Sequence, residues 1–364
     1  MTPRDYSEDE LVEQPTLELL RSLGYEVANG LEEKLGADAL GRDDQSQVFL
    51  RHRLRRKLAE LNPELPGEAI DSAVEELMQD RSALERTRAN QAVHKLLRDG
   101  VDVPVVDESG DRETETVRLI DWTEPANNEF LAVSQFWVVG PLHTRRCDIV
   151  CFVNGIPLVL LELKASHKSV EQAYRKNLTD YRDTIPQLFV PNAFALLSTG
   201  SATKVGATFA AWERFGEWKR IDDESERGVV SLETAVRGVL EPARFLDVVG
   251  NFVAYLERPG GLVKVLAQNH QVLGVNAAMR ALADPETRRG RLGVFWHTPG
   301  VRQEPLDALL HPEGVEAHAR QLDVRDGHRQ SRAGRSALRG VQGRRRGRRT
   351  PPGEDVDAPA AAAR

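Results

Sequence analysis

The spacing of apolar residues changes along the chain from a helical period to a strand-like alternation. In the first hundred residues apolar positions recur every three or four residues, which predicts amphipathic helices. We expect these helices over 8–24, 45–61, 67–80 and 83–98. Beyond Gly110 the residues alternate and are rich in β-branched and aromatic types, which predicts strands. We expect strands over 114–122 and 129–139, a hairpin over 145–165, a helix over 168–183 and a strand over 192–200.

The rest of the chain, from about residue 208, changes character twice. Residues 208–218 are typical of a helix or an irregular segment, and helical spacing then returns. We expect helices over 233–255, with a break near Pro242, and over 262–284, followed by a strand over 291–298. From Val301 onward there is no aromatic residue, no isoleucine and no lysine, so this part cannot build a core.

This order of elements predicts an α/β sheet domain followed by a second domain that is cut short. We therefore divide the chain into a sheet domain with N-terminal helices at 1–235, a linker and domain start at 236–300, and a disordered tail at 301–364. The length of 364 residues suits about two domains.

Composition argues mainly against particular classes of protein and site. There is no apolar run near the roughly 18 residues that span a bilayer and no signal-peptide pattern at the N-terminus, so we expect a cytoplasmic protein without a membrane partner. The net charge of −7 gives no general argument for a nucleic-acid partner. Cys147 and Cys151 lie four residues apart on one predicted strand, so we expect neither a disulfide nor a zinc site but two small buried side chains.

The hairpin RRCDIVCFVNGIPLVLLELKAS, residues 145–166, carries Asp148, Glu162 and Lys164 in otherwise apolar strands. Asn154-Gly155 is a strong turn signal, but loop length decides which face each side chain takes. A two-residue turn would place Asp148 opposite Leu161, on the other face from Glu162. A three-residue loop over 153–155 would bring the three polar residues to one face, and a catalytic role requires that arrangement.

On one face, Asp148 and Glu162 could hold a divalent cation between them, because carboxylate oxygens are ligands that suit Mg²⁺. Such an ion polarises a phosphate oxygen and lowers the pKa of a bound water. Lys164 would offset the repulsion between the carboxylates and help to position the attacking water. The alternative is a strand end at which Glu162 and Lys164 simply point into solvent.

The arrangement resembles the PD-(D/E)xK nuclease core, and the surrounding segments are similar to the restriction subunit of type I restriction–modification enzymes. The similar segments are LVEQPTLELLRSLGYE, RRCDIVCFVNGIPLVLLELK, NLTDYRDTIPQLFVPNAFALLSTG and GVFWHT. The resemblance implies a restriction-endonuclease-like mixed sheet flanked by helices. It also implies that Asp148 and Glu162 bind Mg²⁺ and that Lys164 completes the nuclease site.

The family has a Gln-x-x-x-Tyr motif on the next helix, and the resemblance carries that role to Tyr181. The Gln position is Asn177 here, an amide one methylene shorter. Glu13 on the first helix is a weaker candidate for a third acidic group, and a plain exposed helix residue is the favoured interpretation. The implied partners are double-stranded DNA and the modification and specificity subunits.

The resemblance also implies an ATP-driven superfamily 2 motor after GVFWHT, opened by a Gly-rich phosphate loop. Gln268 and Gln271 lie where the family contacts adenine, although glutamines on amphipathic helices are more often solvent-facing. After His297-Thr298 no Gly-Lys-Ser and no lysine follow, so we expect this chain not to bind ATP. The family then implies a Mg²⁺-dependent endonuclease without a usable motor.

Two interpretations of the missing loop remain, a degenerate loop and a frameshift. Permitted codons for Val301 to Pro312, read one base later, give S-G-K-S-P-S-M-L-F-F-T, which restores the phosphate loop after Gly300. The same shift over 320–339 gives a sequence similar to the next motor motif. We therefore favour a frameshifted restriction subunit. The alternative function is a non-catalytic scaffold with the nuclease fold, or a pseudogene remnant.

Overall fold

A six-stranded mixed sheet forms the centre of the computed structural model, which describes residues 12–36, 40–106 and 110–283. Its strands, in spatial order, are β1 (Glu26–Asn29), β4 (Phe130–Val139), β5 (Thr144–Val153), β6 (Ile156–Leu163), β7 (Phe194–Ser198) and β8 (Thr203–Ala207). The β1–β4 and β6–β7 pairs are parallel and the others antiparallel. The predicted mixed α/β sheet is therefore confirmed.

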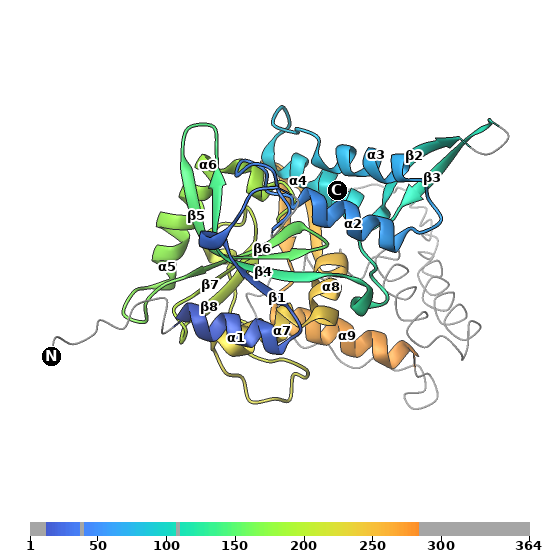
Figure 1. The fold of residues 1–364 in the computed structure, drawn as a ribbon. Helices are drawn as coiled ribbons and strands as arrows, with labels where there is room; N and C mark the ends of the chain where they lie inside the picture. Colours follow the sequence, from blue (N-terminus) through green and yellow to red (C-terminus); the bar gives the residue numbers. More distant parts are fainter. Residues whose placement is uncertain (1–11, 37–39, 107–109, 284–364) are drawn as a thin grey trace, which may run out of the picture.

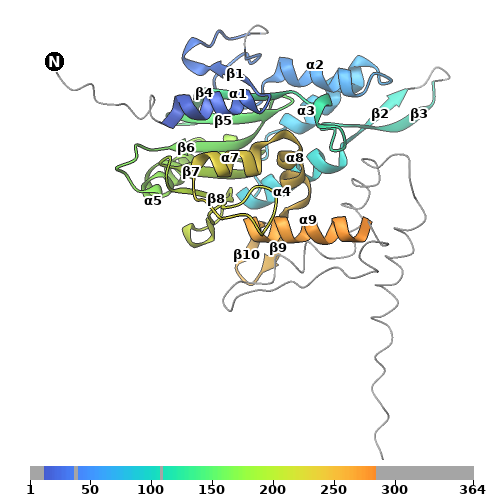
Figure 2. The ribbon, with the colours of Figure 1, turned by 90° about the horizontal axis from the view of Figure 1, so that it is seen from below.

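Helices cover both faces of this sheet. They are α1 (Gln14–Ser22), α2 (Arg51–Leu61), α3 (Gly67–Met78), α4 (Arg86–Asp99), α5 (Val170–Gln172), a π-helical segment (Ala173–Leu178), α6 (Thr179–Thr184), α7 (Leu232–Leu240), α8 (Pro242–Asn251) and α9 (Asn269–Ala283). Short 3-10 turns lie at Gly30–Glu32, Pro125–Asn127, Pro186–Phe189 and Trp212–Arg214. In Figure 1, α1 and α7 lie below the sheet and α3, α4 and α6 above it, and Figure 2 shows α1, α7 and α8 from their own side.

Two small hairpins stand apart from the main sheet: β2 (Val101–Val106) with β3 (Arg112–Val117), and β9 (Val253–Arg258) with β10 (Gly261–Leu266). The prediction of one long helix over 262–284 is wrong in its first part. Residues 261–266 pair with β9, and α9 begins only at Asn269. Over so short a run, the sequence Leu-Val-Lys-Val-Leu is compatible with either a strand or a helix. The helix predicted over 233–255 is wrong in its last residues, since α8 ends at Asn251 and β9 begins at Val253, and the strands β1, β2 and β8 were not predicted.

One hydrophobic core joins the sheet to the helices on either side of it. Every residue of β6 is buried, which is typical of a strand covered on both faces. The Phe245 ring of α8 lies 6.2 Å from that of Phe130 and 6.0 Å from that of Phe194, both on the sheet. The boundary predicted after residue 235 falls inside α7, whose Ala235 and Val236 belong to this same core. The predicted strand at 291–298 and the tail from 301 lie outside the described residues, as does the part of the predicted linker and domain start (236–300) from residue 284 on.

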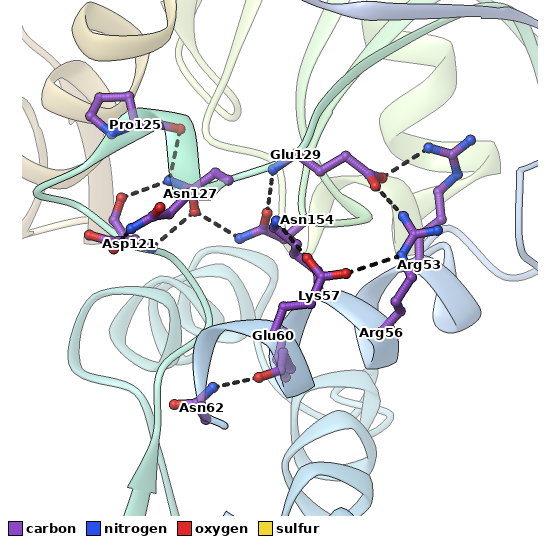
Figure 3. Close-up of polar contacts among 12 residues, drawn as sticks. Arg53, Arg56, Lys57, Glu60, Asn62, Asp121, Pro125, Asn127, Glu129 and Asn154 are labelled. Carbon is purple, nitrogen blue, oxygen red and sulfur yellow. Dashed lines mark hydrogen bonds and ion pairs between the residues drawn. The ribbon is translucent and has the colours of Figure 1, made fainter. Parts of the chain in front are cut away.

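The turn between β5 and β6 has two residues. Asn154 and Gly155 both have positive φ, 53° and 80°, as a type I′ turn requires, and Val153 pairs with Ile156 across it. The three-residue loop expected from the polar pattern is therefore wrong. The turn is buried rather than exposed: Asn154 Oδ1 accepts from the Glu129 N–H at 2.8 Å, and the Glu129 carboxylate reaches Arg53 and Arg56 of α2 (Figure 3).

A bulge in β6 corrects the register that this turn sets. Phe152 pairs with Pro157, whereas the next residue of β5, Cys151, pairs with Val159, so Leu158 is an extra residue in β6. The shifted register then continues to Ile149 and Leu161.

Candidate active site

Asp148, Glu162 and Lys164 meet where β5 and β6 separate. One step beyond the Ile149–Leu161 pair, the shifted register sets Asp148 opposite Glu162, so the two side chains share a face. The Lys164 Nζ lies 2.6 Å from Glu162 Oε1 and 3.8 Å from Asp148 Oδ2. The grouping that the sequence required is therefore present, produced by the bulge at Leu158 rather than by a longer loop.

The end of β6, which carries two of these residues, is hydrogen-bonded to both neighbouring strands. The Leu163 N–H donates to Asp148 Oδ2 at 2.8 Å, so a side-chain oxygen takes the place of a strand carbonyl. The next amide, that of Lys164, donates to the Ser198 carbonyl at the end of β7 at 2.8 Å. Successive N–H groups of β6 thus point alternately towards β5 and β7, and on the β5 side the Asp148 carboxylate replaces the backbone partner.

Glu162 is the most unusual group of the cluster because its carboxylate is fully buried. Burial raises its pKa well above the ordinary value, the neighbouring Asp148 raises the pKa further, and Lys164 lowers it in part. Its Oε2 atom has no hydrogen-bond partner among the described residues. A buried carboxylate oxygen without a donor is costly unless something else supplies positive charge.

The donor set fits a small divalent cation. The Lys164 ammonium contacts both Glu162 Oε1 and, at 2.7 Å, the Leu163 carbonyl, so these two oxygens and Asp148 Oδ2 converge on one positive charge. Among the described residues no group of three or more His, Cys, Asp or Glu side chains could hold a metal ion. Two carboxylates and a carbonyl leave the remaining positions to water and phosphate oxygens, which is the usual way that proteins hold Mg²⁺.

Tyr181 and Asn177, on the helical segment after β6, lie beside this cluster. The Tyr181 hydroxyl donates to the Arg146 carbonyl of β5 at 3.1 Å. Burial raises the Tyr181 pKa, and the nearby Glu162 raises it further, whereas a hydrogen bond with Asn177 lowers it. The shorter amide of Asn177 therefore still reaches the tyrosine. This tyrosine is a neutral donor that ties the helix to the strand bearing Asp148.

Glu13 is not the exposed helix residue that the sequence favoured. Its side chain is buried, and Oε2 accepts from Gln135 Nε2 of β4 at 2.6 Å. Gln135 has φ 54°, and the β4–β5 register places it opposite Asp148 although neither residue pairs in the ladder. Strained backbone of this kind is frequent at functional sites. Gln135 was not singled out from the sequence, although it is the one large amide inside the apolar run FLAVSQFWVV.

Gln268 and Gln271 flank the start of α9. Gln268 is exposed, whereas Gln271 is buried and its Oε1 accepts from the Gln268 N–H at 2.9 Å, which caps the helix. Their suggested contact with adenine stays a prediction, since the expected phosphate loop lies outside the described residues.

The two cysteines are free and buried, as predicted. Burial raises the pKa of Cys147, with further contributions from Glu162 and Asp148, and burial raises that of Cys151 as well. Both are therefore neutral thiols within the core. In the part of the chain that the structure describes, no helix has the length and apolarity needed to cross a membrane.

Comparison with known proteins agrees with this arrangement. The family model described as "Type I restriction enzyme R protein N terminus" matches residues 5–214. The HindI endonuclease subunit of a type I restriction enzyme from Haemophilus influenzae is 34% identical over 300 residues, which cover 79% of this chain and 28% of that protein. A Methanocaldococcus jannaschii protein that carries the name of a type I endonuclease subunit, MjaIXP, is 26% identical over 81% of this chain and 30% of its own length.

The chain thus spans less than a third of the length of these relatives. The matched region contains the mixed sheet, the bulged hairpin and all residues of the cluster around Glu162. The chain belongs to the family of type I restriction enzyme R proteins and corresponds to their N-terminal region.

Proposed function

We propose that this chain is a Mg²⁺-dependent DNA endonuclease that hydrolyses phosphodiester bonds of double-stranded DNA. The observation that carries the proposal is the fully buried Glu162 carboxylate, which shares a face with Asp148 and has one oxygen without a donor. A protein keeps such a costly arrangement when an ion or a substrate balances it. The names of the relatives, which are type I restriction endonuclease subunits, support the same reading.

In the proposed reaction Asp148 and Glu162 hold the cation, and the Leu163 carbonyl lies beside them as a further ligand. When bound, Mg²⁺ supplies charge for the phosphate oxygens and acidifies a water ligand. Lys164 carries the positive charge nearest to both carboxylates, so its ammonium is placed to stabilise negative charge that develops on the phosphate. Tyr181 stays neutral and fixes the helix beside β5.

Nicking of a supercoiled plasmid by the purified chain tests this function. We expect cleavage with Mg²⁺ and none with EDTA, and loss of cleavage in Asp148→Asn, Glu162→Gln and Lys164→Met. Calorimetric titration should show Mg²⁺ binding by the wild type and Lys164→Met but not by Glu162→Gln. Glu171→Gln is a matched control, because Glu171 is partly exposed on α5 and, among the described residues, its ion pair is with Arg175 at 2.7 Å.

Two outcomes would contradict the proposal in different ways. Equal and negligible Mg²⁺ binding by the wild type and Glu162→Gln would favour a scaffold that keeps the fold without the chemistry. Cleavage that survives in Asp148→Asn would place the active site elsewhere.

The partners of the longer relatives belong to the proposal as well. We propose that the intact protein works with modification and specificity subunits, and that ATP drives its motor. For this chain we propose no ATP binding, and a titration with labelled ATP tests that. The proposed frameshift near Gly300 concerns residues outside the described part, and the nucleotide sequence there decides it.

A further inference from the structure

Arg146 stands out among the residues near the cluster because no carboxylate of the described residues pairs with its guanidinium. It lies in β5, two residues before Asp148, and is exposed. Among the described residues it makes no ion pair, and its guanidinium carbon lies 5.5 Å from the centroid of the Trp137 ring. An exposed guanidinium held in one place beside a candidate nuclease site suggests a substrate contact.

The neighbouring arginine shows that this is not a general property of the strand. Arg145 lies on the opposite face of β5 and forms a bidentate ion pair with Asp180 of α6, with distances of 2.5 and 3.0 Å. Its charge is therefore balanced inside the protein. Of two adjacent arginines, one anchors α6 and the other remains available.

Strand geometry places Arg146 on the same face as the cluster. Side chains alternate along β5, and the burial pattern follows this alternation, with Arg146 exposed, Cys147 buried and Asp148 partly exposed. Two residues of a strand span about 7 Å, a distance that an arginine side chain can bridge. Arg146 is therefore within reach of a phosphate next to one bound at Asp148 and Glu162.

The Trp137 ring holds the guanidinium in position. Trp137 and Arg146 are direct cross-strand partners in the β4–β5 ladder, and Trp137 is itself partly buried. Stacking on an aromatic ring restricts the side chain without using its N–H donors, so less freedom is lost when it binds a phosphate. The Tyr181 hydroxyl also donates to the Arg146 carbonyl, which fixes the backbone at this residue.

We propose that Arg146, positioned by Trp137, binds the DNA backbone at a phosphate adjacent to the one that is cleaved. The inference rests on the proposed nuclease function and adds a substrate-binding residue to it. The β4–β5 hairpin, which carries Arg146 in β5, rises from the sheet beside α6 in Figure 1. A forked guanidinium suits phosphate oxygens better than an ammonium does.

DNA binding measured against salt concentration tests this role. Fluorescence anisotropy with a short labelled duplex is measured in Ca²⁺ in place of Mg²⁺, for the wild type, Arg146→Gln, Arg146→Lys and Arg145→Gln. We expect Arg146→Gln to weaken DNA binding about threefold to tenfold. The negative slope of log K against log salt should become shallower by about 1, since one phosphate contact is lost. Arg146→Lys should keep the slope but bind more weakly than the wild type. Arg145→Gln should bind within about twofold of the wild type.

Two further readouts separate this role from a structural one. Arg146→Gln should keep the wild-type thermal midpoint and the wild-type Mg²⁺ affinity in calorimetry, because Arg146 contacts neither carboxylate. If Arg146→Gln binds DNA with the wild-type affinity and slope, the inference is overturned even where the wild type cleaves. Suppose that the wild type binds DNA but does not cleave it, and that Arg146→Gln binds with a shallower salt dependence. The nuclease proposal then fails and the phosphate contact stands. A wild type that does not bind DNA overturns the contact as well.

Discussion

Asp148 and Glu162 face each other across β5 and β6 because Leu158 is an extra residue in β6. Without that bulge, the two-residue turn at Asn154-Gly155 would set Asp148 opposite Leu161 and send the two carboxylates to opposite faces. The pairing of the buried Glu162 with the partly exposed Asp148 therefore depends on one local irregularity of the strand. The effect of this pair on stability without metal and its effect on Mg²⁺ binding can be measured separately, in EDTA and in Mg²⁺.

We expect Glu162→Gln to stabilise the metal-free chain at neutral and alkaline pH. Because burial and Asp148 raise the folded-state pKa of Glu162, its contribution to stability is present below the ordinary value of 4.5 and is lost as pH rises through the raised value. The variant has no such group. In EDTA at pH 8 its thermal midpoint should exceed that of the wild type by at least about 2 °C, the shift that 1 kcal/mol gives in a domain of this size.

Added Mg²⁺ should reverse the order of the two proteins. A ligand that binds the folded state raises the midpoint, so the wild type should gain stability with Mg²⁺ and Glu162→Gln should not. A variant that is less stable than the wild type in EDTA at pH 8 would show that Lys164 fully offsets the buried charge.

Asn154→Ala should be strongly destabilising. The buried Asn154 amide donates to Leu119 O and Asn128 Oδ1, both at 2.9 Å, and accepts from the Glu129 N–H. Alanine leaves these groups unpaired and is strained at φ 53°. We expect the free energy of unfolding, measured in urea, to fall by about 3–5 kcal/mol. The loss combines one or two buried groups left without a hydrogen bond and the strain of alanine at positive φ.

Asn154→Gly separates the two causes, because glycine adopts positive φ freely and removes only the hydrogen bonds. It should cost less than Asn154→Ala by about 1 kcal/mol. Asn127→Ala is the control: Asn127 is an exposed asparagine whose side-chain amide donates to Asp121 Oδ2 at 2.8 Å, and its loss should change stability by less than about 1 kcal/mol. Equal losses at positions 127 and 154 would contradict the role of the turn.

The sequence predicted the turn, the strands and the polar residues of this hairpin, but not how they fit together. Asn154-Gly155 and the alternation of apolar residues are local signals, and local signals predict local structure. The bulge at Leu158 has only a weak local signal, Pro157, whose missing N–H is typical of a bulge but does not fix the register beyond it. Buried Glu13 was also missed, since its partner Gln135 lies 122 positions away. Contacts between distant segments depend on the packing of α1 against the sheet, which no single stretch of sequence encodes.

Gly30→Ala tests the strained backbone beside the cluster. A Cβ at Gly30 would lie 2.5 Å from the carbonyl oxygen of Gln135, which is the residue with φ 54° in β4. The backbone oxygen cannot move without disturbing the strand, so we expect a loss of about 1–3 kcal/mol in urea unfolding. We also expect weaker Mg²⁺ binding, because the β4–β5 register places Gln135 opposite Asp148.

Gly67→Ala is the matched control for Gly30→Ala. A Cβ at Gly67 meets only the end of the Arg55 side chain at 3.6 Å, and the residue begins α3. Alanine there should leave stability unchanged or raise it by up to about 1 kcal/mol. If both variants unfold at the wild-type urea concentration, the close approach of Gly30 to β4 has no energetic role.

His94 should make the chain less stable in mild acid. It is buried on α4 against the Tyr255 ring of β9, 5.5 Å between centroids, and burial, with Lys264 and Arg98 nearby, lowers its pKa to about 3. Between the ordinary value of 6.5 and about 3, the unfolded chain binds a proton at this histidine and the folded chain does not. Stability is therefore lost as pH falls through this window, by about 2 kcal/mol at pH 5.

His94→Gln cannot bind that proton, so its free energy of unfolding in urea should fall less than that of the wild type between pH 7 and pH 5. A free energy of unfolding that falls as much in His94→Gln as in the wild type between pH 7 and pH 5 would contradict the prediction.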